Sequence, residues 1–292
     1  MLDAEQFQAC FVSWVAGLTG LGPEIVAIDG KTLRRSYQEG GAKAPIHMVS
    51  AWSAKQNLVL GQIKVADKSN EITAIPKLLD MLTIKGAIVT IDAMGCQREI
   101  AAKVIEKQAD YVLALKGNQG TLRDDVEEFF TEQKANKYAD CKPSCPKTLE
   151  KSHGRIETRT VTVVGDVDWL TERHAWEGLA SIVMVESCRE IGAKTERECR
   201  FYITSLSADA ERLSTAIRGH WGVENGLLWV MDMVFRDDEC RIRKNNAPAN
   251  FTTVKHMASN LLRTAPGKDS LRVKRKVAAW DDDYIAEIIA PK

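Results

Sequence analysis

The chain lacks both a long apolar run and a net charge. No stretch approaches the roughly 18–20 apolar residues that a membrane-spanning helix needs. No Lys or Arg precedes the apolar residues among the first 18 positions, although a signal peptide would begin with positive charge. These absences predict an N-terminal helix and no membrane partner. The balance of 40 Lys and Arg against 40 Asp and Glu also lacks the basic excess common in nucleic-acid-binding proteins.

The seven cysteines lack a pattern that would give them a shared role. They are scattered and odd in number, and a chain of 292 residues needs no disulfides to support its core. Cys141 and Cys145 lie close together, but no second Cys or His pair has the spacing of a zinc site. Reduced thiols in a cytoplasmic protein are therefore the better interpretation.

What the sequence does contain is an alternation of short apolar strands and helical patterns. The strands are predicted at 24–29, 46–53, 57–65, 87–92 and 111–116, and the helices at 70–82 and 97–107. This alternation indicates an α/β sheet layered by helices. A charged helix at 121–134 and β-rich runs at 156–164, 180–186 and 200–205 follow, before a helical pattern from 209 to 235.

Two of the predicted strands end in an aspartate followed by a small residue. IVAIDG places Asp29 before a glycine, and IVTIDA places Asp92 before an alanine. Ligands of α/β sheets bind at the carboxyl ends of strands. If the two strands are parallel neighbours, the two carboxylates repel each other and need a proton or a cation between them. The alternative is that each aspartate simply ends its strand.

The helical pattern at 209–235 supplies a third acid. Glu224 falls on the same 3–4-residue spacing as Trp221 and Leu228, where a charge is costly unless it is paired or binds a metal. A shifted apolar face, formed by Val223, Leu227 and Val230, is the alternative. Gly222 and Gly226 lie in the same helix and cost helix stability, so packing or function must offset them.

Three acids that converge from two strands and a helix can hold two divalent cations. Carboxylate oxygens suit Mg²⁺ or Mn²⁺. Two such ions can activate a water or hydroxyl group and stabilise the transition state of phosphoryl transfer.

Five motifs occur in one order within a resemblance that extends from about residue 7 to 265: IDGKTLRRSY, TIDAMGCQ, LALKGNQGTL, SHGRIETR and HWGVENGLLWVMDMVFRDDECRIRKNNAPANF. In these the chain resembles the DDE transposases of bacterial insertion sequences, specifically the H-repeat-associated type. The resemblance implies an α/β fold with an RNase H-like core, interrupted by a β-rich insertion before the last acid. It implies that Asp29, Asp92 and Glu224 are the catalytic, metal-binding acids.

The resemblance has departures as well. The broader class has Tyr, Arg, Glu and Lys around its last acid, where this chain has Ile217, His220, Glu224 and Met231. His220 and the following tryptophan fit the narrower H-repeat group, but Leu228 replaces a histidine of that group. Family members also carry a further N-terminal segment, so we expect an N-terminally short copy. The expected parts are a helical remnant at 1–20, core segments at 21–116 and 207–265, the insertion at 117–206 and a tail at 266–292.

The charges of the chain are segregated, which reopens the question of DNA. Residues 241–276 hold ten Lys and Arg and one acid, whereas residues 204–239 hold seven acids and three bases. A basic stretch favours nucleic acid because phosphate contacts release counterions, although a solvated helical face is the alternative. The candidate DNA contacts are Lys31, Arg34, Arg35, Arg155, Arg159, His220, Trp221, Asn225, Arg241, Arg243 and Lys244.

Several of these candidates have a competing structural interpretation. Lys31, Arg34 and Arg35 suit a solvated loop equally well. Arg155 and Arg159 share a strand face with a glutamate, so an internal ion-pair ladder is as plausible as DNA. Trp221 is predicted mainly as a core residue, and His153 of the same motif set has no assigned role. Asn118 and Gln119 are read first as a turn and helix start.

The sequence thus predicts a metal-dependent transposase that cleaves transposon ends and transfers DNA strands in the bacterial cytoplasm, at the nucleoid. Its partners would be double-stranded DNA and a second copy of itself, because two ends must be brought together. One alternative is an inactive remnant that at most binds DNA. A metal phosphohydrolase that does not act on DNA is a third hypothesis, against which the basic stretch argues.

Overall fold

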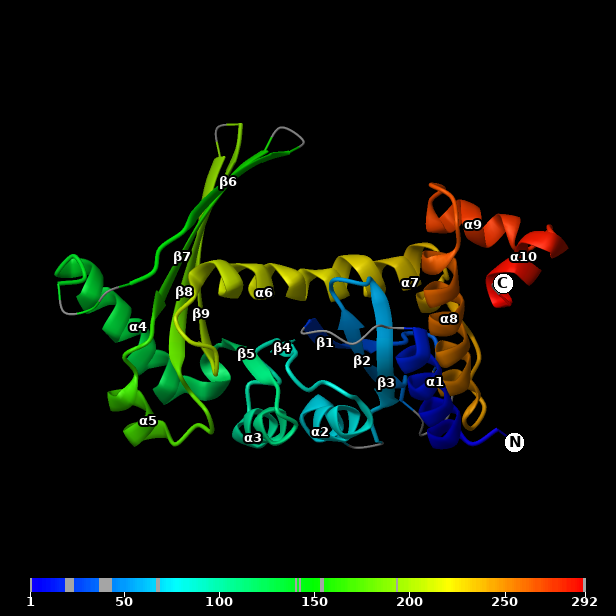
Figure 1. The fold of residues 1–292 in the computed structure, drawn as a ribbon, viewed down its shortest axis with the longest axis horizontal. Helices are drawn as coiled ribbons and strands as arrows, with labels where there is room; N and C mark the ends of the chain where they lie inside the picture. The colour runs from blue at the N-terminus through cyan, green and yellow to red at the C-terminus, as the bar shows by residue number, and fades with distance from the viewer. Residues whose placement is uncertain are drawn as a thin grey trace. The chain divides into compact units, whose positions relative to one another are not determined.

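The structure is a computed structural model that describes residues 2–18, 24–36, 44–66, 69–139, 141, 143–152, 155–192 and 194–290 (Figure 1). His153 lies outside these residues. The chain forms two compact units. Unit 1 comprises Met1–Thr83 and Trp221–Lys292, and unit 2 comprises Ile84–His220. In the sequence, unit 2 is therefore one continuous segment that separates the two segments of unit 1. The five-part division expected from the sequence stays a prediction.

Where the structure describes unit 1, it contains three antiparallel strands, β1 (Ile25–Thr32), β2 (His47–Ser53) and β3 (Leu58–Lys64), in the order β3-β2-β1. The expected hairpin between β2 and β3 is confirmed, and Asn57 closes it with a positive φ of 57°, a conformation that asparagine tolerates well. The prediction that the first strand ends at Asp29 is wrong, because Gly30, Lys31 and Thr32 continue the pairing with β2.

Helices cover the strands of unit 1. They are α1 (Ala4–Leu18), α2 (Glu71–Met81), α7 (Trp229–Met233), α8 (Ala247–Thr264), α9 (Leu271–Val277) and α10 (Asp282–Ile289). Both α1 and α8 pack against β3 and against each other (Figure 1). Phe11 and Val15 of α1 enter a buried apolar cluster with Trp52 of β2 and Val59 of β3. The N-terminal helix predicted from the sequence is confirmed.

Among the described strands, β3 pairs with β2 alone, and α8 completes its other edge. Asn260 of α8 is fully buried. Its side-chain amide donates to the carbonyl of Val59 and accepts from the N–H of Val59, both at 2.9 Å. An edge strand with open backbone groups invites pairing with other chains. The two hydrogen bonds of Asn260 satisfy one residue of that edge in the way a neighbouring strand would.

Replacing Asn260 by alanine should lower the free energy of unfolding by about 3 kcal/mol, because a buried N–H and a buried C=O both lose their partner. Urea unfolding followed by circular dichroism measures the change. Asn250→Ala is the matched control, since Asn250 lies on the same helix and bonds the carbonyl of Leu2. Equal losses in the two variants would contradict the role of Asn260.

The described part of unit 2 contains six strands in the order β4-β5-β9-β8-β7-β6. Strand β4 (Ile88–Ile91) runs parallel to β5 (Asp110–Leu115), and α3 (Arg98–Glu106) connects them. The remaining pairs are antiparallel and involve β6 (Lys147–Ser152), β7 (Arg155–Val164), β8 (Ser181–Ile191) and β9 (Lys194–Thr204). The predicted class, an α/β fold with a mixed sheet flanked by helices, is confirmed, as is a β-rich segment before Glu224.

The long strands β8 and β9 are buried at one end only. Residues 181–185 and 201–204 are buried, whereas residues 190–191 and 194–199 are exposed. Figure 1 shows α4 (Gly120–Ala135) and α5 (Asp168–His174) beside these strands. Stacked rings support the packing, with Phe129 against Trp169 at 5.2 Å between centroids and Phe130 against Phe201 at 6.0 Å. The exposed ends of β8 and β9 form a two-stranded part of a longer ribbon.

The helix predicted at 209–235 exists but is not uniform. It begins as α6 (Ala210–Gly222), widens into the π-helical segment η2 (Val223–Leu228), and returns to α-helix in α7. The division between the two units falls inside this run, after His220. None of the described helices is both long and apolar enough to cross a membrane.

A buried charged group lies on α8, beneath the strands of unit 1. Lys255 donates to Asp237 at 2.6 Å, and both side chains are almost fully buried. The neighbouring His256 is buried too, and burial lowers its pKa to about 4, although Asp237 acts in the opposite direction. The imidazole is therefore neutral in the folded protein at neutral pH.

We expect the stability of unit 1 to fall as the pH drops from 6.5 towards 4. The pKa of His256 in the folded protein lies below its unfolded value near 6.5, so the unfolded chain binds more protons in this window. Proton binding therefore stabilises the unfolded chain and lowers the free energy of unfolding as the pH falls. A difference of about 2.5 pKa units corresponds to about 3 kcal/mol. Urea unfolding at several pH values measures it, and His256→Gln should flatten the slope. An unchanged slope in that variant would contradict the prediction.

Candidate active site

Asp29 lies on β1, where it is half-buried and its Oδ1 accepts the N–H of Gly30 at 2.8 Å. Because side chains alternate along a strand, Asp29 and Gly30 face opposite sides of the sheet. Behind Gly30, His47 and Glu71 pair at 2.5 Å, and a Cβ at position 30 would overlap both side chains. Glycine therefore leaves room for the hydrogen-bonded His47 and Glu71 on one face, while Asp29 points to the other.

Glu224 lies in the π segment η2, and its side chain is exposed. The expectation that it sits on the core-facing stripe is wrong, whereas the alternative face is confirmed: Val223, Leu227 and Val230 are the buried residues. The cause is the wider π turn, which shifts the side chains relative to the 3.6-residue period of an α-helix. Such π segments occur frequently at functional sites.

Trp52 fixes this segment against the sheet of unit 1. Its side chain is fully buried, and η2 packs against β1 and β2. A Cβ at Gly226 would lie 2.9 Å from the indole ring of Trp52, and one at Gly222 would lie 3.2 Å from its Nε1. The two glycines flagged in the sequence therefore admit the ring. As a result, the strand of Asp29 and the segment of Glu224 belong to one packed body.

Asp92 belongs to unit 2 and directly follows β4, as predicted. Its Oδ1 accepts the N–H groups of Met94 at 3.0 Å and Gly95 at 3.4 Å, the geometry of an aspartate that folds its own turn. Cys96 is buried in this turn, and burial together with the charge of Asp92 raises its pKa to about 12. The thiol therefore stays protonated and unreactive.

Two side-chain amides brace the turn that follows Asp92. Asn118 donates to the carbonyl of Ala93 at 2.6 Å, and Gln119 donates to the carbonyl of Cys96 at 3.0 Å. Both residues lie in the short 3-10 helix η1 (Gly117–Gln119) that precedes α4. The turn and helix start predicted for this motif are confirmed. Its polar side chains hold the backbone beside Asp92, a role that the sequence alone did not reveal.

His220 lies near Asp92 within unit 2. Its Nδ1 is 3.1 Å from the hydroxyl of Thr90, on β4. Burial lowers the pKa of His220, while the charge of Asp92 and the contact with Thr90 act in the opposite direction. At neutral pH the imidazole is mostly uncharged, so in the free protein it offers a polar group rather than a cation. Thr90 is a contact that sequence reasoning missed, because nothing in the strand pattern marks it.

The structure does not gather the three predicted acids into a described metal site. Within the part of the chain that the structure describes, no three His, Cys, Asp or Glu side chains form a group that could hold a metal ion. Asp29 and Glu224 belong to unit 1 and Asp92 to unit 2. Among the described residues, no Lys or Arg pairs with Asp92 or Glu224. Oxygen donors of this kind suit Mg²⁺ or Mn²⁺. Joint metal binding stays a prediction.

Lys31, a predicted DNA contact, is engaged inside unit 1. Its ammonium group bonds the carboxylate of Asp232 and lies 4.0 Å from Asp238. Arg34 pairs with Asp238 at 3.4 Å, although its side chain is 80% exposed. An exposed pair of this kind contributes little to stability. Arg34 is therefore open to a phosphate, whereas Lys31 would first have to leave Asp232.

Two basic segments far apart in the sequence meet in unit 1. Arg243 donates from Nε to the carbonyl of Arg35 at 3.1 Å. Arg35, Arg241 and Lys244 are exposed. Asn225 is exposed beside Glu224, and Trp221 is half-buried rather than a core residue. Their contact with DNA stays a prediction.

The basic stretch 241–276 is less available to DNA than its composition indicates. Lys255 and Lys274 are buried, the first against Asp237 and the second donating to the carbonyl of Ala265 at 2.6 Å. Arg263 is half-buried against Trp52. Three of the ten cations thus serve the interior of unit 1, which neither the DNA interpretation nor the solvated-face alternative anticipated.

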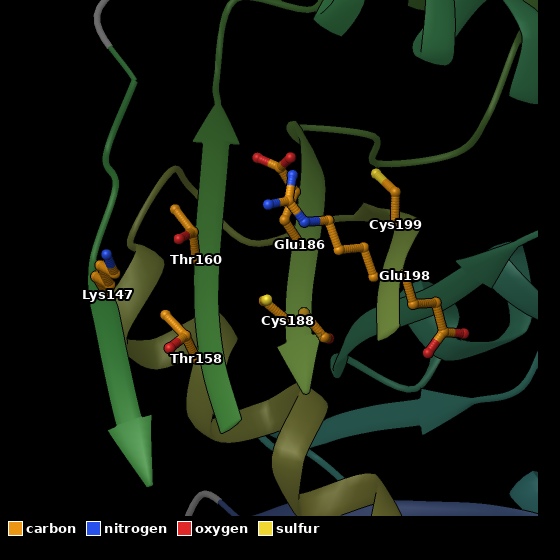
Figure 2. A pocket seen from close by; sticks show the side chains of 9 residues that line it. Lys147, Thr158, Thr160, Glu186, Cys188, Glu198 and Cys199 are labelled. Carbon is orange, nitrogen blue, oxygen red and sulfur yellow. The ribbon is translucent and has the colours of Figure 1, made fainter. Parts of the chain in front are cut away.

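Arg155 and Arg159 of β7 both pair with Glu157, at 3.8 Å and, through Nε of Arg159, at 2.9 Å. The internal ion-pair ladder is therefore present. The other face of the same ribbon has a pocket of about 520 Å³. Figure 2 shows residues that line it, among them Glu186, Cys188 and Cys199. It contains none of the predicted site residues, so it is not the candidate active site.

Comparison with known proteins places the chain in a family. The family profile described as "Transposase DDE domain" matches residues 20–261, and the chain belongs to this family. Over 99% of its length the chain is 42% identical to YbfL and to the "H repeat-associated putative transposase YhhI", both of Escherichia coli K12, and covers 78% of each. The expected resemblance to H-repeat-associated proteins is confirmed.

A solved structure is similar at a greater distance. The piggyBac transposase synaptic complex with hairpin DNA is 11% identical in sequence and superposes with a TM-score of 0.47, over 93% of this chain and 55% of that chain.

We expect Asp92→Asn to lower the pKa of His220 further in the free protein, because the carboxylate is the charge that favours the imidazolium. Titration of the imidazole signals by nuclear magnetic resonance measures it, with His256 as the internal reference. A higher or unchanged pKa in the variant would show that Asp92 and His220 do not interact.

Proposed function

We propose that this protein is a DDE transposase that cleaves the ends of an insertion sequence and transfers the strands to target DNA. The observation that carries the proposal is in unit 1, where Glu224 is exposed on a π segment packed against the strand of Asp29. Membership of the transposase family supports it. In this proposal Asp92 is the third catalytic acid, and the core is RNase H-like.

The three carboxylates would hold the divalent metal. When bound, Mg²⁺ or Mn²⁺ would supply Lewis-acid activation of a water or 3′-hydroxyl and charge stabilisation at the leaving oxygen. The chain's own contribution is to position the carboxylates. Asp92 commits one oxygen to its turn, which aims the other away from the backbone. Glu224 carries no cation partner among the described residues.

The DNA would be double-stranded and held through its phosphates. Arg34, Arg35, Arg241 and Lys244 are exposed cations of unit 1, and arginine pairs with phosphate through two parallel hydrogen bonds. His220, neutral in the free protein, becomes a stronger donor as an approaching phosphate raises its pKa. We also propose that two copies act together at the nucleoid, since strand transfer joins two ends.

Asp29→Asn, Asp92→Asn and Glu224→Gln should each reduce Mn²⁺-dependent cleavage of a DNA fragment with the insertion-sequence ends by at least about a hundredfold. Loss of a group that stabilises transition-state charge has an effect of this order. Denaturing gels measure the nicked product. Glu211→Gln is the matched control, because Glu211 is an exposed acid on the same helical run. Undiminished cleavage by any of the three variants would remove that acid from the site.

The rival is an inactive remnant that binds DNA. A gel shift with the same fragment distinguishes the two, because DNA binding with no cleavage at any Mn²⁺ concentration favours the remnant. Absence of any salt-dependent DNA binding, with hydrolysis of a simple phosphodiester, would favour a phosphohydrolase instead.

A further inference from the structure

Arg263 of α8 lies against the π segment that carries Glu224. Its guanidinium group donates to the carbonyl of Gly226, inside η2. The same group stacks over the indole ring of Trp52, with 4.8 Å between its central carbon and the ring centroid. Arg263 therefore contacts at once the segment of Glu224 and the buried ring on which that segment rests.

The setting is unusual for an arginine because no described carboxylate pairs with it. Its Nε is buried and has no hydrogen-bond partner among the described residues, and the same holds for Nε1 of Trp52. Burial lowers the pKa of Arg263 to about 10. The guanidinium group therefore stays charged at neutral pH, but removing its charge from water costs free energy. An apolar side chain of similar length would fill the space without that cost. The acceptor that the guanidinium group has among the described residues is the carbonyl of Gly226.

The carbonyl that Arg263 binds, that of Gly226, belongs to an irregular helix. In a π segment the N–H bonds the carbonyl five residues back, as Trp229 does with Glu224. Where the helix returns to the four-residue pattern, its backbone bonding changes register, and carbonyls in that region need partners from outside the helix. Gly226 has no side chain to shield its carbonyl, so the guanidinium reaches it. A charge-assisted hydrogen bond at this point favours the π register over a plain α-helix.

We propose that Arg263 is a positioning residue that holds the π register of η2 and thereby sets the direction of Glu224. Closing the segment to α-helix would shift its register by one residue, a rotation of about 100° between the helix before and after it. Glu224 would then leave its exposed face, and Gly222 and Gly226 would no longer both face Trp52. This proposal rests on the proposed catalytic role of Glu224.

The test compares Arg263→Met with Lys274→Met. Lys274 is a matched control because it is also a buried cation of unit 1 that donates to a backbone carbonyl, that of Ala265. We expect both variants to lose stability in urea unfolding. Only Arg263→Met should accelerate amide hydrogen exchange at residues 223–229, by at least about tenfold, while the amides of β2 stay protected. Its kcat for end cleavage should fall at least about tenfold, with the KM for DNA within about twofold of the wild type.

Arg263→Lys replaces Arg263→Met in the exchange measurement if the methionine variant does not fold. Lysine keeps the charge and one hydrogen bond but loses the planar stack on Trp52, so exchange at residues 223–229 should rise by a smaller factor. Equal exchange in the Arg263 and Lys274 variants, or unchanged exchange at residues 223–229, would overturn the proposal.

The exchange measurement needs no catalysis, so it separates this proposal from the proposed function. If Glu224→Gln cleaves normally while Arg263→Met loosens residues 223–229, the catalytic assignment fails and the register role stands. If Glu224→Gln is inactive while Arg263→Met leaves exchange and kcat unchanged, the register role fails and the catalytic assignment stands.

Discussion

The burial of Trp52 against two helical glycines is the contact on which unit 1 depends. A tryptophan that loses all its exposure contributes several kcal/mol of hydrophobic free energy. Each glycine in a helix interior costs about 1 kcal/mol relative to alanine, so the ring offsets what Gly222 and Gly226 lose. Because Trp52 lies on β2, and β2 pairs with β1, this packing joins the backbone that carries Asp29 to the segment that carries Glu224.

The candidate acids are held by different kinds of local structure. Asp29 lies on a strand whose next residue must be glycine, and Glu224 lies on an irregular helix supported from behind by a ring. Asp92 folds a turn around its own carboxylate, and two side-chain amides hold that turn from outside. In each case the support comes from packing or from backbone hydrogen bonds. Among the described residues, no Lys or Arg pairs with Asp92 or Glu224, so no such cation competes there with a metal.

Much of the fold follows from patterns that the sequence shows directly. Period-two and apolar runs located β1–β5, and the motif after β5 was correctly read as a helix start. The direction of Glu224 could not be obtained this way, because a 3.6-residue period is assumed and a π segment breaks it. The glycine pair was the available signal, since two helix-weakening residues one turn apart need a reason. A helix within residues 241–276 was one alternative, but the sequence pattern does not reveal that Lys255 and Arg263 turn inwards, because positive charge usually indicates a surface.

The interrupted order of unit 1 has a consequence for its synthesis. The amide of Asn260 completes the edge of β3 across a separation of 201 residues, and all of unit 2 is made in between. Unit 2 is one continuous stretch, so its strands can pair as soon as they leave the ribosome. During this time the edge of β3 has open backbone groups, and Trp52 is not yet covered by η2. Trp221–Lys292, a segment of 72 residues, is thus the part of the chain that covers this edge and this ring. A chain that stops before it would leave an aggregation-prone edge.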